Sequence, residues 1–148
     1  MSMVITRDLR ILLQKHFALD WDGIHGEPHW KRVHENGLRL AKLTGANSRV
    51  VEAFAFVHDS CRFSDNFDPE HGARAGEFAS ELVANGNLLL EPSELDVLVM
   101  ACRYHSDGCT AEDITIGTCW DADRLDLGRV GLRPDPAYLC TEAARCLV

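Results

Sequence analysis

Apolar residues recur along most of the chain at intervals of three and four positions, which is the spacing of one helical face. The clearest case is the face formed by Val51, Phe54, His58 and Cys61. Only 114–116 has the composition of a strand, and a single strand has no partner. Segments with the helical pattern cover about 6–18, 27–44, 48–62, 68–85, 92–106 and 115–127, and a short seventh helix is expected after 136.

The ends of these segments carry residues that begin and end helices. Pro28 suits a first turn, where a missing N–H costs nothing, and Gly45 suits the position just after a helix. Asp68 followed by Pro69 predicts an N-cap with proline at the first helical position. We therefore predict an all-α fold, a single domain over 1–148 with six or seven helices packed around one core.

Polar side chains that commonly bind metals interrupt the inner faces of five of these helices. They are His29, His58 with the adjacent Asp59, His71, His105 and Asp123. A single histidine on an apolar face is more often a hydrogen-bonded core residue than a ligand. Asp59 and Asp123 are harder to explain in that way, because inward-facing carboxylates repel one another unless a cation lies between them.

The residue types also indicate which ions would fit. Imidazole and carboxylate together suit divalent Mn, Fe, Co, Ni or Zn, whereas Mg and Ca prefer more oxygen ligands. The six cysteines form no CxxC pair, so a cysteine zinc site is not expected. From the residues alone, a metal site and a set of hydrogen-bonded core residues both remain open.

The net charge of −8 limits the partners of the chain. Binding to a nucleic acid polymer needs a basic surface and is therefore disfavoured, while a small anionic ligand remains open. The first ten residues have no apolar run of the kind found in signal peptides, and no run approaches the roughly 18 residues of a membrane span. We expect a cytoplasmic protein with reduced thiols and no membrane partner.

Five segments occur in an order typical of one enzyme superfamily. They are GIHGEPHWKRV at 23–33, AFVHDSCR at 55–62, EHGARAG at 70–76, ACRYHSDG at 101–108 and WDADRLDLGRVG at 120–131. With these segments the chain resembles the HD-domain superfamily of metal-dependent phosphohydrolases over about 23–131, and in particular its small stand-alone bacterial members. The resemblance implies four metal ligands, which are His29, His58, Asp59 and Asp123.

The resemblance also implies an activity and a cofactor. We expect a phosphohydrolase in which a divalent ion (Mn, Fe, Co, Ni, Zn or Mg) activates water against a small phosphorylated substrate, with a nucleotide as the leading candidate. Asp59 would be both a ligand and a proton acceptor, and Arg62 would assist it in catalysis. Arg32, Arg62 and Arg124 would bind the substrate phosphate, although a surface salt bridge explains each arginine equally well.

Two histidines and the last segment leave alternatives open. His71 and His105 either complete a site for a second ion, contact the substrate phosphate or serve only in packing. If both are ligands, an HD-type di-iron oxygenase becomes a second candidate function. The third candidate is a non-catalytic sensor or binding module in which a metal braces the helices. The segment 138–148 either docks as a helix or joins a homodimer contact.

Overall fold

The computed structural model describes residues 4–148, which contain seven α-helices, two short 3-10 helices and no strand. The helices are α1 (Arg7–His16), α2 (Glu27–Thr44), α3 (Ser48–Val57), α4 (His71–Ala84), α5 (Pro92–Tyr104), α6 (Ile114–Arg124) and α7 (Glu142–Arg145), with η1 (Leu127–Val130) and η2 (Pro136–Tyr138) between α6 and α7. The predicted all-α fold is confirmed. The strand-like residues 114–116 form the first turn of α6, which the Asp113 carboxylate caps by accepting the backbone N–H of Ile116 at 2.9 Å.

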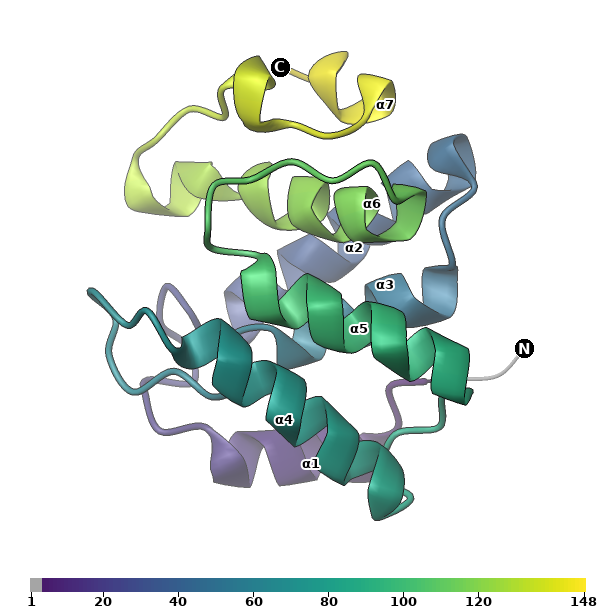
Figure 1. The fold of residues 1–148 in the computed structure, drawn as a ribbon. Helices are drawn as coiled ribbons and strands as arrows, with labels where there is room; N and C mark the ends of the chain where they lie inside the picture. Colours follow the sequence, from purple (N-terminus) through teal and green to yellow (C-terminus); the bar gives the residue numbers. More distant parts are fainter. Residues whose placement is uncertain (1–3) are drawn as a thin grey trace.

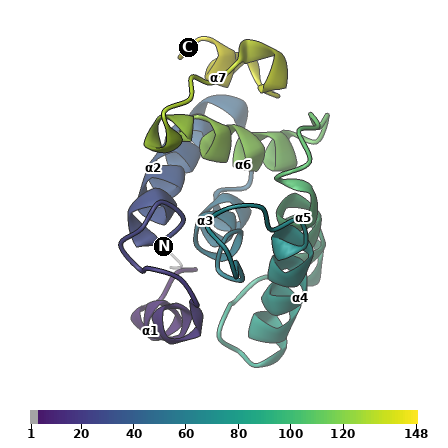
Figure 2. The same ribbon diagram turned by 90° about the vertical axis from the view of Figure 1, so that its left-hand side faces the viewer.

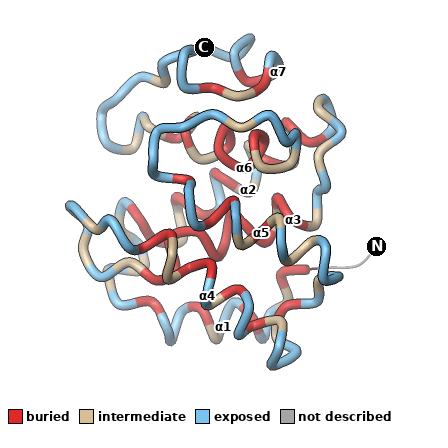
Figure 3. Tube along the Cα trace, in the orientation of Figure 1, coloured by how far each residue is buried: buried red, intermediate tan, exposed pale blue. Residues whose placement is uncertain are grey.

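Helix α3 lies at the centre of the fold. Helix α2 lies on one side of α3, the antiparallel pair α4 and α5 lies on the other, and α6 crosses above it (Figures 1 and 2). Every residue from Ala53 to Val57 is buried, and the buried positions of the chain gather around this helix (Figure 3). A helical segment that is apolar on all sides, as 53–57 is, is stable only inside a protein, so the second half of α3 sets where its neighbours pack.

Helix α3 ends at Val57, earlier than the predicted 62, because the side chain of the next residue, His58, hydrogen-bonds to carbonyl oxygens of the last turn. The Nδ1 atom of His58 lies 3.0 Å from the carbonyl oxygen of Phe54 and 3.1 Å from that of Ala55. Residues 58–61 then form turns. Asp59 is therefore presented from a turn at the end of the most buried helix, and not from within a helix.

Two other helix boundaries also differ from prediction. Helix α4 begins at His71 and not at Asp68, because the Asp68 carboxylate is used by the backbone N–H of Phe63 at 2.7 Å and by Arg74 at 2.6 Å. Asp68 thus closes the loop before α4 instead of capping the helix. Helix α6 ends at Arg124 and not at 127, since the chain tightens into η1.

Five helix termini meet at one end of the bundle. The amino-terminal ends of α2 and α4 and the carboxyl-terminal ends of α3, α5 and α6 all lie on the left-hand side of Figure 1. This topology gathers the residues at 25–29, 58–62, 71, 105 and 123–126. Side chains that are far apart in the sequence therefore share one small volume.

The segment 138–148 docks on α6 through a buried carboxylate. Asp121 is fully buried, and it accepts hydrogen bonds from the backbone N–H of Cys140 (2.7 Å), from that of Thr141 (2.8 Å) and from the Thr141 hydroxyl (2.7 Å). The segment covers the outer side of α6 at the top of Figure 1. The segment 138–148 therefore docks on α6, as one of the two expectations had it, and a homodimer contact stays a prediction.

All six cysteines are free. Cys61, Cys102 and Cys119 are buried, and burial raises the pKa of each of these thiols. They behave as small apolar residues of the core. Within residues 4–148, none of the helices combines the length and the apolar character needed to cross a membrane.

Helices α4 and α5 approach closely because glycine faces the contact. A Cβ atom on Gly72 would lie 2.6 Å from the carbonyl oxygen of Cys102 and 2.8 Å from that of Arg103. These are backbone atoms, so the clash can be relieved only by moving α4 and α5 apart. The same close approach brings together His71 and His105, whose Nε2 atoms lie 2.9 Å apart.

We predict that Gly72→Ala destabilises the protein by about 1–3 kcal/mol, because the added methyl group overpacks the α4–α5 contact. Urea unfolding followed by circular dichroism measures the change. Gly128→Ala is the matched control, since its Cβ would meet nothing within 4 Å. Its effect should stay within about 0.5 kcal/mol. Equal unfolding midpoints for the two variants would contradict the close-packing argument.

Candidate metal centre

The inward-facing histidines and aspartates named above come together in one buried cluster, here called the centre. Two of its histidines stand directly after the last turn of a helix. His58 follows α3, and His105 follows α5, where its Nδ1 atom lies 2.7 Å from the carbonyl oxygen of Cys102. The last carbonyls of a helix have no intrahelical donor, so an imidazole N–H placed there satisfies one of them. A carbonyl oxygen can only accept a hydrogen bond. Nδ1 therefore carries the hydrogen in both His58 and His105.

Two further histidines are held in the same way. The Nδ1 atom of His71 lies 2.5 Å from the carbonyl oxygen of Asp68, and that of His29 lies 2.6 Å from the Asp126 carboxylate. Each of the four rings thus donates Nδ1–H to an oxygen and directs Nε2 into the centre. Metal-binding histidines almost always have this second hydrogen bond, which fixes both the tautomer and the orientation of the ring.

The Nε2 atoms face each other in two pairs. Those of His29 and His58 are 3.1 Å apart, and those of His71 and His105 are 2.9 Å apart. With Nδ1 protonated, a neutral ring offers only a lone pair at Nε2, and two lone pairs cannot hydrogen-bond to each other. A cation must therefore lie between the members of each pair, either a proton or a metal ion.

Asp59 lies between the two histidine pairs and turns one oxygen to each. Its Oδ2 atom is 3.5 Å from the Nε2 atoms of both His29 and His58. Its Oδ1 atom is 3.3 Å from Nε2 of His71 and 3.4 Å from Nε2 of His105. The side chain is almost completely buried. A carboxylate in this position can bridge two cations.

Asp123 completes the first pair. Its Oδ1 atom lies 3.0 Å from Nε2 of His29 and 3.4 Å from Nε2 of His58. Each of these imidazole nitrogens is thus within 3.5 Å of both Asp59 and Asp123. The four residues predicted as metal ligands come together around one point, contributed by α2, by α3 and the turn after it, and by α6.

The electrostatics of the centre favour positive charge. Burial alone would raise the pKa of the Asp59 carboxyl, but the charge of His58 and the neighbouring His105 hold that pKa well below its usual range. The pKa of Asp123 is likewise held well below its usual range against burial, by His58 and His29. The helix dipoles of α3, α5 and α6 direct their negative ends here, against the positive ends of α2 and α4.

The spacing of the ligand atoms matches that around a metal ion. With metal–nitrogen bonds of about 2.1 Å, two ligands lie about 3.0 Å apart at a right angle and about 3.4 Å apart at a tetrahedral angle. The contacts above span 2.9–3.5 Å. Three overlapping groups have all their ligand atoms within 4.8 Å of one another: His29, His58 and Asp59; His58, His105 and Asp123; and Asp59, His71 and His105. These buried clusters can hold a metal ion.

Asp126 is a residue of the centre that the sequence did not reveal. One of its oxygens accepts the Nδ1–H of His29 at 2.6 Å, and the other accepts from Nε of Arg32 at 2.7 Å. These two bonds hold the pKa of Asp126 below its usual range although burial acts in the opposite direction. The available signal was its position three residues after Asp123, which places both on one face of the chain.

Two buried nitrogen atoms face Asp59 and have no hydrogen-bond partner among residues 4–148. His25 bonds to the carbonyl oxygen of Asp65 through Nε2 at 3.0 Å, which leaves its Nδ1 atom 3.5 Å from Oδ2 of Asp59. The Nε atom of Arg62 lies 3.5 Å from Oδ1. Buried polar atoms are normally paired. An ion or oxyanion bound next to Asp59 would give both atoms a partner.

The three arginines predicted to bind phosphate occupy different places. Arg32 is half-exposed and holds Asp126. Arg124 is almost buried and donates to the carbonyl oxygen of Tyr138 at 2.6 Å. Arg62 donates through Nη1 to two carbonyls of its own loop and is the arginine that contacts Asp59. Their roles in substrate binding stay predictions.

Comparison with known proteins adds nothing to this geometry. No protein-family model, no curated protein and no solved structure matches the chain. The likeness to the HD superfamily thus rests on the five sequence segments. The clustering of their histidines and aspartates around Asp59 is a separate observation, made from the fold.

We predict that Asp126→Asn weakens metal affinity about 10–100-fold, because His29 loses the carboxylate that fixes its tautomer. Isothermal titration calorimetry with Mn²⁺ or Zn²⁺ measures the affinity. Glu52→Gln is the control, since it removes the carboxylate of a partly exposed pair of the same kind, His34 with Glu52 at 3.0 Å. Unchanged affinity in Asp126→Asn would show that the carboxylate does not orient His29.

Proposed function

We propose that this protein is a metal-dependent phosphohydrolase that holds two divalent ions, one on each side of Asp59. The observation that carries the proposal is the pairing of four imidazoles about one buried carboxylate, each with Nδ1 bonded to an oxygen and Nε2 directed at its partner ring. The five segments that resemble the HD superfamily support the same function. Asp123 adds a second carboxylate to the His29–His58 side.

The ions would be held by His29, His58 and Asp123 on one side and by His71 and His105 on the other, with Asp59 shared. Divalent ions in such sites lower the pKa of bound water and polarise a phosphoryl oxygen. This ligand set of imidazole and carboxylate fits Mn, Fe, Co, Ni or Zn better than Mg.

The residues around Asp59 would bind the phosphoryl group of the substrate and accept a proton from the attacking water. Asp59 lies between the two histidine pairs, so it would be placed to accept a proton from the attacking water. The Nε–H of Arg62 has no hydrogen-bond partner in the described part of the chain and can donate to a phosphoryl oxygen beside Asp59. A cavity of about 320 Å³ lined by Arg62, His71 and Ser106 gives a substrate access to this side.

One observation favours a second candidate, an HD-type di-iron oxygenase. Both His71 and His105 direct Nε2 toward the shared carboxylate, as two iron sites would require. The two functions differ in their need for oxygen. Hydrolysis of a phosphate ester proceeds without O₂, so phosphate release under anaerobic conditions distinguishes the phosphohydrolase.

We predict that the chelator-treated protein takes up two divalent ions per chain and that His71→Ala takes up one. The reason is that His71 serves only the second side of Asp59. Equilibrium dialysis followed by elemental mass spectrometry gives the count. His34→Ala is the control and should keep two ions, since His34 pairs with Glu52 outside the centre. A single ion in the unaltered protein would refute both the two-ion site and the di-iron alternative.

We predict that Asp59→Ala lowers kcat/KM for phosphate-ester hydrolysis by at least about 10²–10⁴-fold, the contribution of a general base, while the helical circular dichroism signal survives. A screen of nucleotides and phosphomonoesters with Mn, Co, Ni and Mg first identifies a substrate for the unaltered protein. Asp96→Ala, at an exposed acid of α5, is the control. Absence of turnover across the whole screen would instead support a metal-braced binding module.

A further inference from the structure

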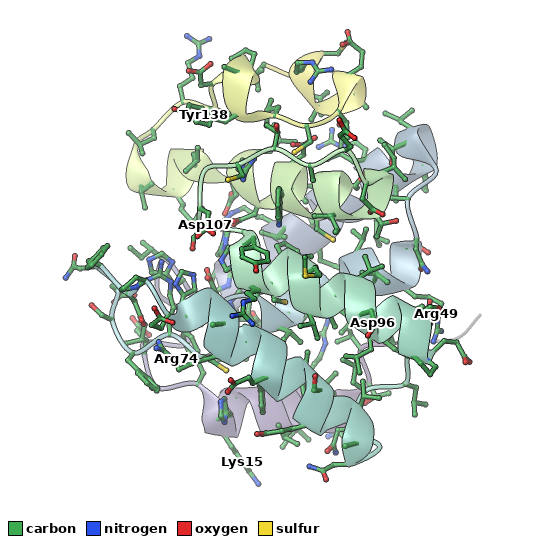
Figure 4. The ribbon with its side chains drawn as sticks, viewed as in Figure 1. Lys15, Arg49, Arg74, Asp96, Asp107 and Tyr138 are labelled. Carbon is green, nitrogen blue, oxygen red and sulfur yellow. The ribbon has the colours of Figure 1, made fainter. Side chains whose placement is uncertain are left out.

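A cavity of about 380 Å³ opens directly beside the metal centre. His105 and Asp123 contribute to its wall, and both also belong to the centre. The opposite wall comes from the chain after α6, between Leu132 and Leu139. Tyr138, on this wall, lies at the same end of the molecule as Asp107 of the loop after α5 (Figure 4). A molecule held at the centre can therefore extend into this cavity.

The outer wall is held in place by two buried charged residues of α6. Arg124 donates to the carbonyl oxygen of Tyr138 at 2.6 Å, and its guanidinium lies 5.3 Å from the centre of the Trp120 ring. Asp121 accepts three hydrogen bonds from Cys140 and Thr141. Hydrogen bonds to charged groups are the stronger ones. The wall is thus a fixed part of the fold next to the ligands.

The lining of the cavity is mainly apolar and also includes two exposed residues of opposite charge, Arg133 and Asp135. Leu127, Leu132 and Leu139 contribute aliphatic surface, and Tyr138 contributes a half-exposed ring. Arg133 is exposed at the cavity and makes no hydrogen bond or ion pair within residues 4–148. A guanidinium can stack on a planar ring or pair with an anion. The volume falls in the range of about 300–1,000 Å³ usual for sites of small molecules.

We propose that this cavity binds the alcohol part of the substrate and selects esters of an aromatic alcohol. The inference rests on the proposed phosphohydrolase function, which places the phosphoryl group at Asp59. In the reaction, the oxygen of water bonds to phosphorus, the bond from phosphorus to the alcohol oxygen breaks, and the aromatic alcohol leaves with a proton. The ring lies against the leucines and Tyr138, and Arg133 covers its exposed face.

Binding of two non-hydrolysable probes to the Mn²⁺-loaded protein tests the cavity without turnover. We expect (1-naphthylmethyl)phosphonate to bind at least tenfold more tightly than methylphosphonate, as measured by calorimetry. Leu132→Trp fills the cavity and should reduce this ratio to near one. Leu43→Trp is the control, because Leu43 is an exposed leucine outside the cavity, and it should retain the ratio. Leu132→Ala removes apolar wall without adding bulk and should lower the ratio severalfold.

Equal affinity for the two probes in the unaltered protein would overturn the proposal, as would the same ratio in Leu132→Trp and Leu43→Trp. Turnover of 1-naphthyl phosphate and methyl phosphate, measured in parallel, separates this inference from the proposed function. A retained binding ratio without any hydrolysis refutes the phosphohydrolase alone. Hydrolysis of both esters without a binding preference refutes the aromatic cavity alone.

Discussion

The hydrogen bonds from imidazole Nδ1 to fixed oxygens are the constraint on which the centre depends. His58, His71 and His105 each donate to a backbone carbonyl three or four residues earlier, so the helix ends themselves set the ring orientation. Because those bonds fix the proton on Nδ1, the Nε2 lone pairs converge in a buried space. The arrangement is satisfied only when a cation joins them. The requirement for positive charge is thus built into the termini of α3, α4 and α5.

The carboxylates also need positive charge in the centre. An ionised Asp59 inside the protein is costly unless it is paired, and here the imidazoles around it supply the partners. Asp126 extends the network outward, since it holds His29 on one side and Arg32 on the other. The pKa of His29 is accordingly raised, because Asp123 and Asp126 outweigh its burial. Ordering of the ligands and charge balance are therefore parts of one network.

Much of this could be predicted from the sequence, for identifiable reasons. The period of apolar residues predicted the helical fold, and metal-type residues on inner faces predicted which side chains converge. The ends of the helices were predicted less well, because Asp68 and His58 use their side chains for tertiary and terminal bonds that no local pattern reveals. Asp126 was missed because its partner His29 lies 97 residues away in the chain.

The charged residues of the segment at 121–126 show how one helix end serves two sites. Asp121 and Arg124 are three residues apart and face the C-terminal segment, where they hold the cavity wall. Asp123 and Asp126 are also three residues apart and face the opposite way, toward His29. A step of three residues nearly completes a helical turn and keeps the members of each pair on one side, while the offset of two residues between the pairs turns them to opposite sides. Any shift of this helix end would therefore move Asp123 and the cavity wall together, so the geometry of the candidate metal centre and that of the cavity are coupled.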